Sequence, residues 1–349
     1  MKCLISVVMP VYGVERWLES AARSVLDQTE RSLELILVDD GSPDKSGALC
    51  DRLAEEDARV SVVHLSENGG LSHARNEGLA RAVGKYVFFM DSDDVIEPNL
   101  LQSAVQAAES AQADWLIFGA TEEHYDASGR LTLTRRIVPE PRVCRSQADK
   151  EAAVIALEKQ TLLGYAWNKL YRAGFLRENG LTFRSVELIE DILFNIECAR
   201  YARVSVVLDN AGYHYARRAS GSLTGRVLEN YFELNSRRVS MLLALYDEWN
   251  AANDSVLDAL AAIYARYVVS ALERLYDPRR GLTAAERRER ARRIQAQPLY
   301  IRLRPRFHGA MGLIAGSPLL ALPAGWALHM MHAHLSGLFT RLRAKTHKI

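Results

Sequence analysis

The chain has 349 residues, of which 48% are hydrophobic and 25% charged, an ordinary composition for a globular protein with a sizeable core. It contains no low-complexity tract and no internal repeat, which excludes a disordered or repeat architecture. The net charge of +1 conceals a basic end: residues 277–349 hold 14 Lys or Arg and 3 Asp or Glu, which indicates an anionic partner.

The cysteines and the first residues bear on the cellular compartment. The four cysteines lie far apart, without metal-ligand or redox spacing, which indicates reduced thiols in a cytosolic setting. The opening MKCLISVVMPVYG has one Lys and a short apolar run broken by Pro10. This run is too brief for a signal peptide, and we interpret it as the first strand.

The first 120 residues alternate between apolar runs typical of strands and segments typical of helices. This repeated βα pattern predicts an α/β fold with a doubly wound, mostly parallel sheet, and such sheets bind nucleotides at their strand ends. The predicted strands are 5–11, 33–38, 60–65, 86–90 and 115–119, and the predicted helices are 15–26, 46–56, 71–82 and 98–111.

The fourth predicted strand runs directly into a cluster of carboxylates, in the sequence KYVFFMDSDDV. Asp91 and Asp93 flank Ser92 on extended backbone, so both carboxylates can point to the same side. Two hard oxygen donors facing one cleft suit Mg²⁺ or Mn²⁺. The alternative is that the segment only turns the chain and caps the helix near Pro98, and we interpret Asp94 as such a turn or cap residue.

The second and third predicted strands, like the fourth, also end in polar residues. PVYG follows the first without Gly-x-Gly-x-x-Gly spacing, which counts against a dinucleotide cofactor. The second ends in Asp39 and Asp40, and the third ends near Asn68, before a helix that carries Arg75. Each loop alone is a good turn sequence, but three polar ends on one edge of a sheet indicate a binding site.

Four segments, in this order and spacing, carry a resemblance to a known family: SVVMPVYG, LELILVDDGS, ENGGLSHARNEGL and GKYVFFMDSDD. They resemble the nucleotide-diphospho-sugar-binding half of family 2 glycosyltransferases, which have the GT-A fold. One departure is Gly13, where the family more often has Asn. The resemblance implies a GT-A catalytic domain over residues 1–225, with a nucleotide-sugar-binding half (1–120) and an acceptor-binding half (121–225).

The resemblance also implies roles for the nucleotide-side residues of the first two strands. Pro10, Val11 and Tyr12 line the nucleotide pocket. The carboxylates of Asp39 and Asp40 reach the uracil of a UDP-sugar, and we favour Asp40 for this contact. A carboxylate can accept a hydrogen bond from the base N–H, which favours uracil over a base with an acceptor at that position.

Further roles follow for the third and fourth strands. Asn68 and Arg75 are similar to family positions around the base, ribose and phosphates, and the guanidinium fork suits phosphate oxygens. Asp91 would hold the ribose or a metal-bound water, Asp93 would coordinate the metal directly, and Ser92 lies between them in the nucleotide-sugar site. The implied cofactor is a divalent cation, Mn²⁺ or Mg²⁺, that neutralises charge on the leaving diphosphate.

The segment 164–194 resembles the acceptor-side half of the same family. It carries Asp191 over as the general base for the acceptor hydroxyl, with Glu190 beside it; the alternative is that both only favour the helix dipole. Trp167 is either a core residue or a stacking face for a sugar, and Lys169 is either solvated or a pyrophosphate contact.

Two further strands are predicted at 204–208 and 212–215. From the segment that follows them, Arg217 or Arg218 could close onto the diphosphate. We interpret His214 as a structural histidine and leave it out of the predicted metal site.

The remainder, residues 226–349, is predicted to be helical and basic. Residues 309–340 contain no Asp, Glu, Lys or Arg but are interrupted by two prolines and three histidines, so peripheral or re-entrant contact with an anionic membrane fits better than a clean span. The alternative is an apolar helical pair that packs on the protein itself or on a second subunit of a homo-oligomer. Nucleic acid is not expected, because the basic region lacks interleaved aromatic residues.

Together these features predict an inverting, metal-dependent glycosyltransferase of the hexosyltransferase type. It would move a sugar from a UDP-sugar to a saccharide or lipid-linked saccharide acceptor in the biosynthesis of capsule, exopolysaccharide or lipopolysaccharide. The expected location is the cytoplasm, at the cytoplasmic face of the inner membrane. Two alternatives are a phosphohydrolase that uses Asp91 and Asp93, and a non-catalytic membrane scaffold that binds nucleotide sugars.

Overall fold

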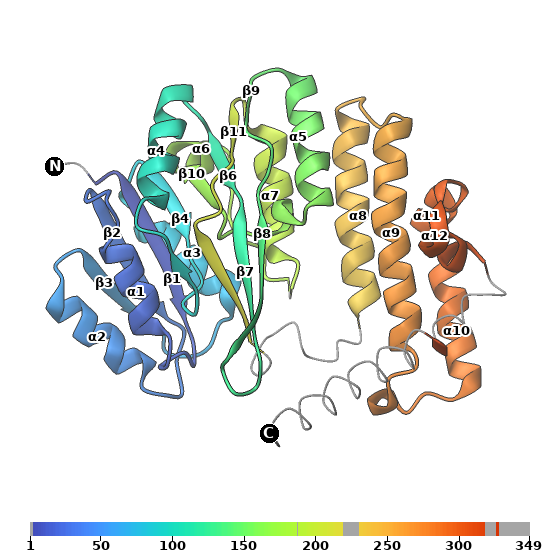
Figure 1. Cartoon of the computed structure of the whole chain (residues 1–349), viewed down its shortest axis with the longest axis horizontal. Coiled ribbons are helices and arrows are strands. Elements are labelled where there is room, and N and C mark those ends of the chain that lie inside the picture. The colour runs from blue at the N-terminus through green and yellow to red at the C-terminus, as the bar shows by residue number, and fades with distance from the viewer. Residues whose placement is uncertain (1–2, 187, 219–229, 318–325, 328–349) are drawn as a thin grey trace, which may run out of the picture. The chain divides into compact units, whose positions relative to one another are not determined.

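The computed structural model describes residues 3–186, 188–218, 230–317 and 326–327. The chain divides into two compact units, Met1–Val227 and Leu228–Ile349, each with its own buried side chains (Figure 1). The expected boundary was residue 225. The first unit contains the strands and all the predicted site residues, so its architecture determines the geometry of the candidate site.

An eight-stranded sheet runs through the first unit in the order β3-β2-β1-β4-β10-β6-β11-β9 (Figure 1). The first four of these strands are parallel, whereas β10 is antiparallel to both of its neighbours. This sheet confirms the predicted α/β class. Its strands are β1 (Ile5–Val11), β2 (Leu33–Asp39), β3 (Val60–His64), β4 (Tyr86–Phe89), β6 (Trp115–Phe118), β9 (Arg142–Cys144), β10 (Lys169–Arg172) and β11 (Ser205–Leu208).

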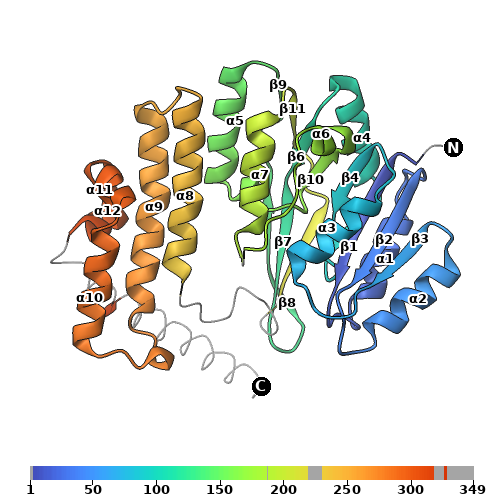
Figure 2. The ribbon, with the colours of Figure 1, turned by 180° about the vertical axis from the view of Figure 1, so that it is seen from behind.

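Helices cover both faces of this sheet, which explains why β1 and β4 are buried throughout and apolar except for Ser6 (Figure 2). On one face, Val7 of β1 packs in a core with residues of α1 and α4. On the opposite face, a Cβ at Gly78 of α3 would overlap Val8, so the glycine lets α3 approach β1 closely. The helices of this unit are α1 (Leu18–Leu26), α2 (Ser46–Glu56), α3 (Leu71–Arg81), α4 (Leu100–Ala111), α5 (Gln147–Lys159), α6 (Ala173–Glu178) and α7 (Glu190–Tyr201).

A second, four-stranded sheet in the same unit has the order β5-β12-β7-β8. Strand β12 lies parallel to β7 and antiparallel to β5. The chain passes from β6 into β7 through Gly119, where a Cβ would overlap the Ile137 carbonyl oxygen, so no larger residue fits this crossing between the sheets. The strands are β5 (Val95–Ile96), β7 (Ala120–Tyr125), β8 (Leu131–Ile137) and β12 (Tyr213–Arg218).

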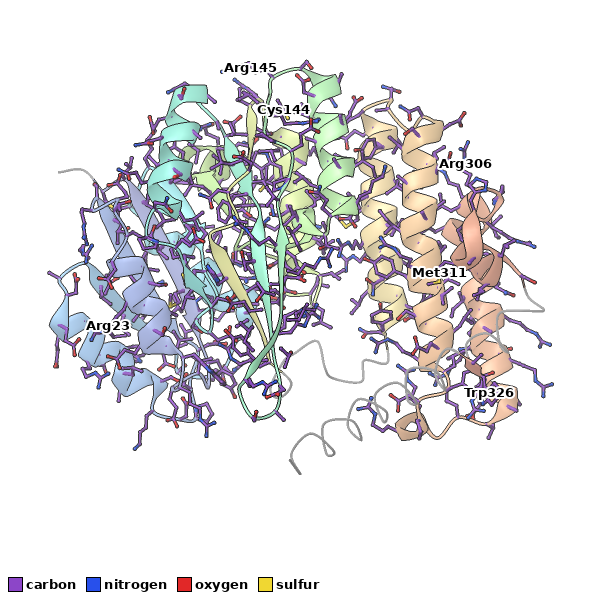
Figure 3. All side chains as sticks on the ribbon, viewed as in Figure 1. Arg23, Cys144, Arg145, Arg306, Met311 and Trp326 are labelled. Atoms are coloured by element: carbon purple, nitrogen blue, oxygen red, sulfur yellow. The ribbon has the colours of Figure 1, made fainter. Side chains whose placement is uncertain are left out.

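The second unit is helical in its described part, as predicted. Helix α9 packs against α8, α11 and α12. Arg306, which is labelled in Figure 3, pairs with Asp258 of α9 at 2.9 Å. The side chains of Met311 and Trp326 are exposed. The helices are α8 (Tyr231–Glu248), α9 (Asp254–Arg274), α10 (Ala284–Gln295), α11 (Pro298–Leu303) and α12 (Gly309–Gly316).

Helix α9 is the one helix in the described part of the chain that is long and apolar enough to cross a membrane. Within its most apolar window, 61% is buried inside the protein, which is also the behaviour of an ordinary core helix. Most of the charge-free stretch 309–340 lies outside the described residues. Contact between residues 277–349 and a membrane therefore stays a prediction.

Candidate active site

Side chains from distant segments meet at the carboxyl ends of the parallel strands. Arg75 lies in the second turn of α3, Asp91 follows β4, and Asp191 lies in the first turn of α7. The Arg75 Nη2 donates to Asp91 Oδ1 at 3.0 Å, and its Nη1 donates to Asp191 Oδ1. The other oxygen of Asp191 accepts a hydrogen bond from the Ala166 amide at 2.9 Å. The structure thus joins the predicted donor-side carboxylate and the predicted base through one arginine.

Arg75 contacts carboxylates in this structure, and its predicted contact with the base, ribose or phosphates stays a prediction. Its side chain is only 1% exposed, and the guanidinium lies over the ring of Phe183 at 5.2 Å. Its two terminal nitrogens donate to Asp91 and Asp191, so the charge of Arg75 faces two partly buried carboxylates in this structure. Sequence alone could not show this, because the partners lie far from Arg75 along the chain.

Burial sets the electrostatics of the acidic side chains in this cluster. It raises the pKa of Asp91 to about 6, although Arg75 acts in the opposite direction, and it raises the pKa of Glu190 to about 7, with a further contribution from Asp191. One oxygen of Glu190 and the Nε of Arg75 are buried without a hydrogen-bond partner in the described part of the chain. Partial burial therefore favours the neutral form of these two acids.

Asp93 lies at the more open side of the cluster, with its side chain 38% exposed. Arg218, at the end of β12, donates to the Asp93 carboxylate and to its carbonyl oxygen, both at 2.7 Å. The same guanidinium stacks on the ring of Trp17 at 4.5 Å. Of the two arginines considered from sequence, Arg218 thus contacts a predicted site residue, whereas Arg217 is exposed.

The donor atoms of Asp91 and Asp93 fit a divalent cation. Both are hard oxygen ligands, and both side chains are partly exposed. No group of three or more His, Cys, Asp or Glu side chains within the described ranges could hold a metal by itself. Mg²⁺ is usually held by one or two carboxylates together with substrate phosphates, so these residues fit an ion whose coordination is completed by a diphosphate.

His214 was left out of the predicted metal site. Its Nδ1 lies 2.8 Å from the Glu123 carboxylate.

Asp94 has a larger structural role than a turn or cap residue. It is almost completely buried and accepts hydrogen bonds from the Tyr213 hydroxyl and the Ala216 amide, both at 2.8 Å. The Tyr213 oxygen in turn accepts from the Asp91 amide at 3.3 Å. These bonds fasten the segment after β4 to β12. Tyr213 and Tyr215 lie two residues apart in β12 and so share one face of the strand. This spacing was the one pattern in the sequence that indicated a buried face in β12.

Asp39 and Asp40 hold the loops that follow β2 and β3. Asp40 accepts hydrogen bonds from the amides of Gly69 at 2.8 Å and Gly70 at 2.9 Å. Asp39 accepts from the Ser42 amide at 3.0 Å, and its second oxygen lies 2.9 Å from His64 Nδ1. Both carboxylates are buried, and the predicted contact of Asp40 with uracil stays a prediction.

The remaining nucleotide-side residues divide by exposure. Pro10 and Val11, at the end of β1, and Ser92 are buried, whereas Tyr12 is 50% exposed and Asn68 is exposed. The side chains of Tyr12 and Asn68 are therefore accessible to a ligand, and Pro10 and Val11 could contribute mainly backbone atoms.

The structure places Lys169 and Trp167 in the core rather than in the site. Lys169 is fully buried, and its ammonium donates to the Leu162 and Tyr165 carbonyls and to the Asn168 side chain, so it does not reach a pyrophosphate. Burial lowers its pKa to about 7.

Both faces of Trp167 are covered, because its ring stacks on Tyr165 at 4.5 Å and on Tyr213 at 4.3 Å. With 2% of the residue exposed, the ring has no face open to a sugar, and the core alternative holds. Tyr165 and Tyr215 are only partly buried members of the same aromatic group.

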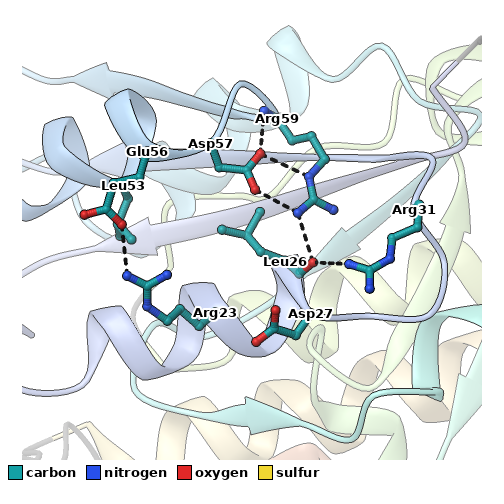
Figure 4. A pocket seen from close by; sticks show the side chains of 8 residues that line it. All are labelled: Arg23, Leu26, Asp27, Arg31, Leu53, Glu56, Asp57 and Arg59. Atoms are coloured by element: carbon teal, nitrogen blue, oxygen red, sulfur yellow. Dashed lines mark hydrogen bonds and ion pairs between the residues drawn. The ribbon is translucent and has the colours of Figure 1, made fainter.

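A pocket of about 230 Å³ lies away from this site, between α1, α2 and the segments that lead into β2 and β3 (Figure 4). Its charged groups satisfy one another: Arg23 pairs with Glu56 at 2.9 Å, and Arg59 pairs with Asp57 at 2.8 Å. Arg31 donates to the Leu26 carbonyl. The pocket therefore offers a ligand few groups that lack a partner.

Comparison with known proteins gives consistent findings. The profile of the family described as "Glycosyl transferase family 2" matches residues 6–179. The chain is 36% identical over 222 residues to the uncharacterized glycosyltransferase EpsJ of Bacillus subtilis, which covers 63% of each chain. It is 31% identical over 253 residues to the putative glycosyltransferase EpsH of the same organism, which covers 71% of this chain and 68% of EpsH.

A shorter match and a solved structure add to these. The putative teichuronic acid biosynthesis glycosyltransferase TuaG of B. subtilis is 40% identical over 105 residues, which is 30% of this chain and 42% of TuaG. The crystal structure of S. aureus TarS residues 1–349 in complex with UDP superposes with a TM-score of 0.60 at 20% identity, covering 95% of this chain and 91% of that one. The likeness to TarS confirms the predicted GT-A fold.

Proposed function

The chain belongs to glycosyl transferase family 2, and from this premise we propose that it is an inverting hexosyltransferase that moves a sugar from a UDP-sugar to a hydroxyl of a saccharide or lipid-linked saccharide. The observation that carries the proposal is the meeting of Asp91 and Asp191 on Arg75. Family membership does not support the phosphohydrolase or scaffold alternatives.

The reaction follows from the chemistry of these groups. Asp191 accepts the proton of the acceptor hydroxyl while that oxygen attacks the anomeric carbon, and the bond from this carbon to the diphosphate oxygen breaks. UDP leaves with the bonding electron pair, and a single displacement inverts the anomeric centre. A positioned carboxylate base contributes roughly 10²- to 10⁴-fold to such a step.

The donor and cofactor rest on different observations. TarS, which shares the fold, has been crystallised with UDP, and the exposed side chains of Tyr12 and Asn68 are accessible to a nucleotide. Asp91 and Asp93 would hold a divalent cation, Mn²⁺ or Mg²⁺, which would neutralise charge on the leaving diphosphate.

The biological setting rests on relatives and on charge. The name of TuaG refers to teichuronic acid biosynthesis, and we extend this to surface polysaccharide biosynthesis for the present chain. The 14 Lys or Arg among residues 277–349 would attract the anionic cytoplasmic face of the inner membrane, where lipid-linked acceptors are found. The match covers only 63% of the length of EpsJ, so the acceptor is part of the proposal.

A UDP-release assay tests the proposal directly. The full chain is incubated with a panel of nucleotide sugars and saccharide acceptors, with Mn²⁺, with Mg²⁺, or with a chelator. We expect release of UDP from at least one UDP-sugar, dependent on acceptor and lost with the chelator. Activity only with sugars of nucleotides other than UDP would refute the UDP assignment. Full activity in the presence of the chelator would refute the requirement for a cation. Release of inorganic phosphate without sugar transfer would favour a phosphohydrolase.

A further inference from the structure

The helix that carries Arg75 is fixed to the sheet by contacts that do not involve the arginine side chain. Helix α3 begins after Gly70, whose φ of 86° favours glycine, and the Gly70 amide is bonded to Asp40. One turn beyond Arg75, Gly78 lets the helix pack directly on Val8 of β1. The start of the helix and its face are therefore both fixed to the sheet. The guanidinium is itself buried, with 1% of the side chain exposed, and lies over the ring of Phe183.

The contacts of Arg75 join the two functional sides of the site. Nη2 bonds Asp91, on the side where the donor is expected, and Nη1 bonds Asp191, the proposed base. The planar guanidinium fork presents these two N–H groups in a fixed relation, which an ammonium cannot do. The position of one carboxylate is thus defined relative to the other by a single rigid group.

Asp191 is restrained at both of its oxygens. Arg75 holds Oδ1, and the Ala166 amide holds Oδ2 at 2.9 Å. Rotation of the carboxylate would break at least one of these bonds. A displacement of about 1 Å from the productive geometry can cost about 10²-fold in rate, so this restraint has a kinetic consequence.

We propose that Arg75 is a positioning residue for the transfer reaction: it sets the carboxylate of Asp191 against the donor side marked by Asp91, rather than binding the donor's phosphates itself. This inference rests on the proposed function. The competing explanation is that Arg75 only neutralises the neighbouring acids Asp91, Asp191 and Glu190, which predicts an effect on stability without an effect on the turnover of folded enzyme.

The substitution Arg75→Lys separates the two explanations, because lysine keeps the charge but can hold only one carboxylate at a time. We expect kcat for transfer to fall about 10²-fold in the folded variant. We expect the affinity for UDP, measured by calorimetry, to change far less. The matched control is Arg81→Lys on the same helix, where the exposed arginine pairs with Glu77 at 2.6 Å and kcat should be unchanged.

A double-mutant cycle with Asp191→Asn shows whether Arg75 acts through the base. Residues that act as a unit are not additive, so Arg75→Lys should change the residual rate of Asp191→Asn by less than about threefold. If Arg75→Lys does not fold, Arg75→Gln/Asp191→Asn removes one charge of each sign, and its rate is compared with that of Asp191→Asn alone.

The outcomes distinguish this inference from the proposed function. A wild-type protein that transfers sugar while Arg75→Lys keeps its kcat overturns the positioning role alone. The same conclusion follows if the loss is as large in the Asp191→Asn background, or if UDP affinity falls in parallel with kcat. A wild-type protein that transfers no sugar from any donor overturns the proposed function and this inference with it.

Discussion

Replacing Asp191 with asparagine removes the proposed base while keeping its size. The amide cannot take a proton from the acceptor, so we expect kcat for transfer to fall by about 10²- to 10⁴-fold. The residues proposed to bind UDP lie on other segments, so UDP affinity should stay close to that of the wild type. The rate is measured as acceptor-dependent UDP release, and affinity is measured by calorimetry.

The effect of Asp191→Asn on stability follows from the two bonds that Asp191 accepts. The asparagine NH₂ must face either Arg75 or the Ala166 amide, both of which are donors, so one bond is lost at a cost of about 1–3 kcal/mol. Removing one of three carboxylates around one arginine offsets part of this cost. We therefore expect the unfolding free energy to fall by about 1–2 kcal/mol in urea titrations.

Glu197→Gln provides the control for Asp191→Asn, since Glu197 lies on the same helix and pairs with Arg200 at 2.7 Å. It should keep the wild-type kcat. Normal turnover by Asp191→Asn would refute the assignment of the base. Loss of UDP binding in step with turnover would instead indicate that the substitution disturbs the donor side.

Two further predictions concern residues beside the site. The ring of His64 donates hydrogen bonds to the carboxylates of Asp51 and Asp39, and these bonds raise the pKa of His64. Its contribution to stability is therefore complete below its unfolded pKa and is lost as pH rises through its folded pKa. His64→Gln should destabilise the protein more at pH ~5.5 than at pH ~8.5, measured by urea unfolding, and an equal effect at both would refute the coupling. Lys169→Met should lower the unfolding free energy by about 2–3 kcal/mol, because three acceptors lose their donor. It should leave UDP affinity unchanged, and weaker UDP binding would indicate that Lys169 does contact the nucleotide.

Local patterns in the sequence were sufficient to predict the elements in the first half of the first unit. The apolar runs predict β1 with its observed bounds, Ile5–Val11, and place the ends of the other early strands within one residue. Buried strands and their flanking turns are specified by neighbouring residues, so a single sequence carries that information. The same patterns predict which edge of the sheet holds the acidic residues.

Contacts between distant segments were beyond this reasoning. Strand β10, Lys169–Arg172, was not predicted, because a strand of four residues gains its identity from pairing with β4 and β6 rather than from its own composition. Lys169 and Trp167 were considered for the site because their types suit ligands, yet each is satisfied by core partners. Burial of a polar residue depends on the surrounding fold, which a local motif does not describe.

The placement of β10 has a consequence for engineering this enzyme. In sequence, the two predicted halves, 1–120 and 121–225, look like separable modules. One strategy for changing acceptor specificity would therefore be to replace residues 121–225 with the same segment of a relative. However, β10 is inserted between β4 and β6, and Asp94 is bonded to Tyr213 and Ala216 of β12. A chimera joined near Gly119 would have to re-create a shared sheet and a buried carboxylate pocket from mismatched parents. Grafting short loops onto one intact parent protein leaves these contacts between the two halves unchanged.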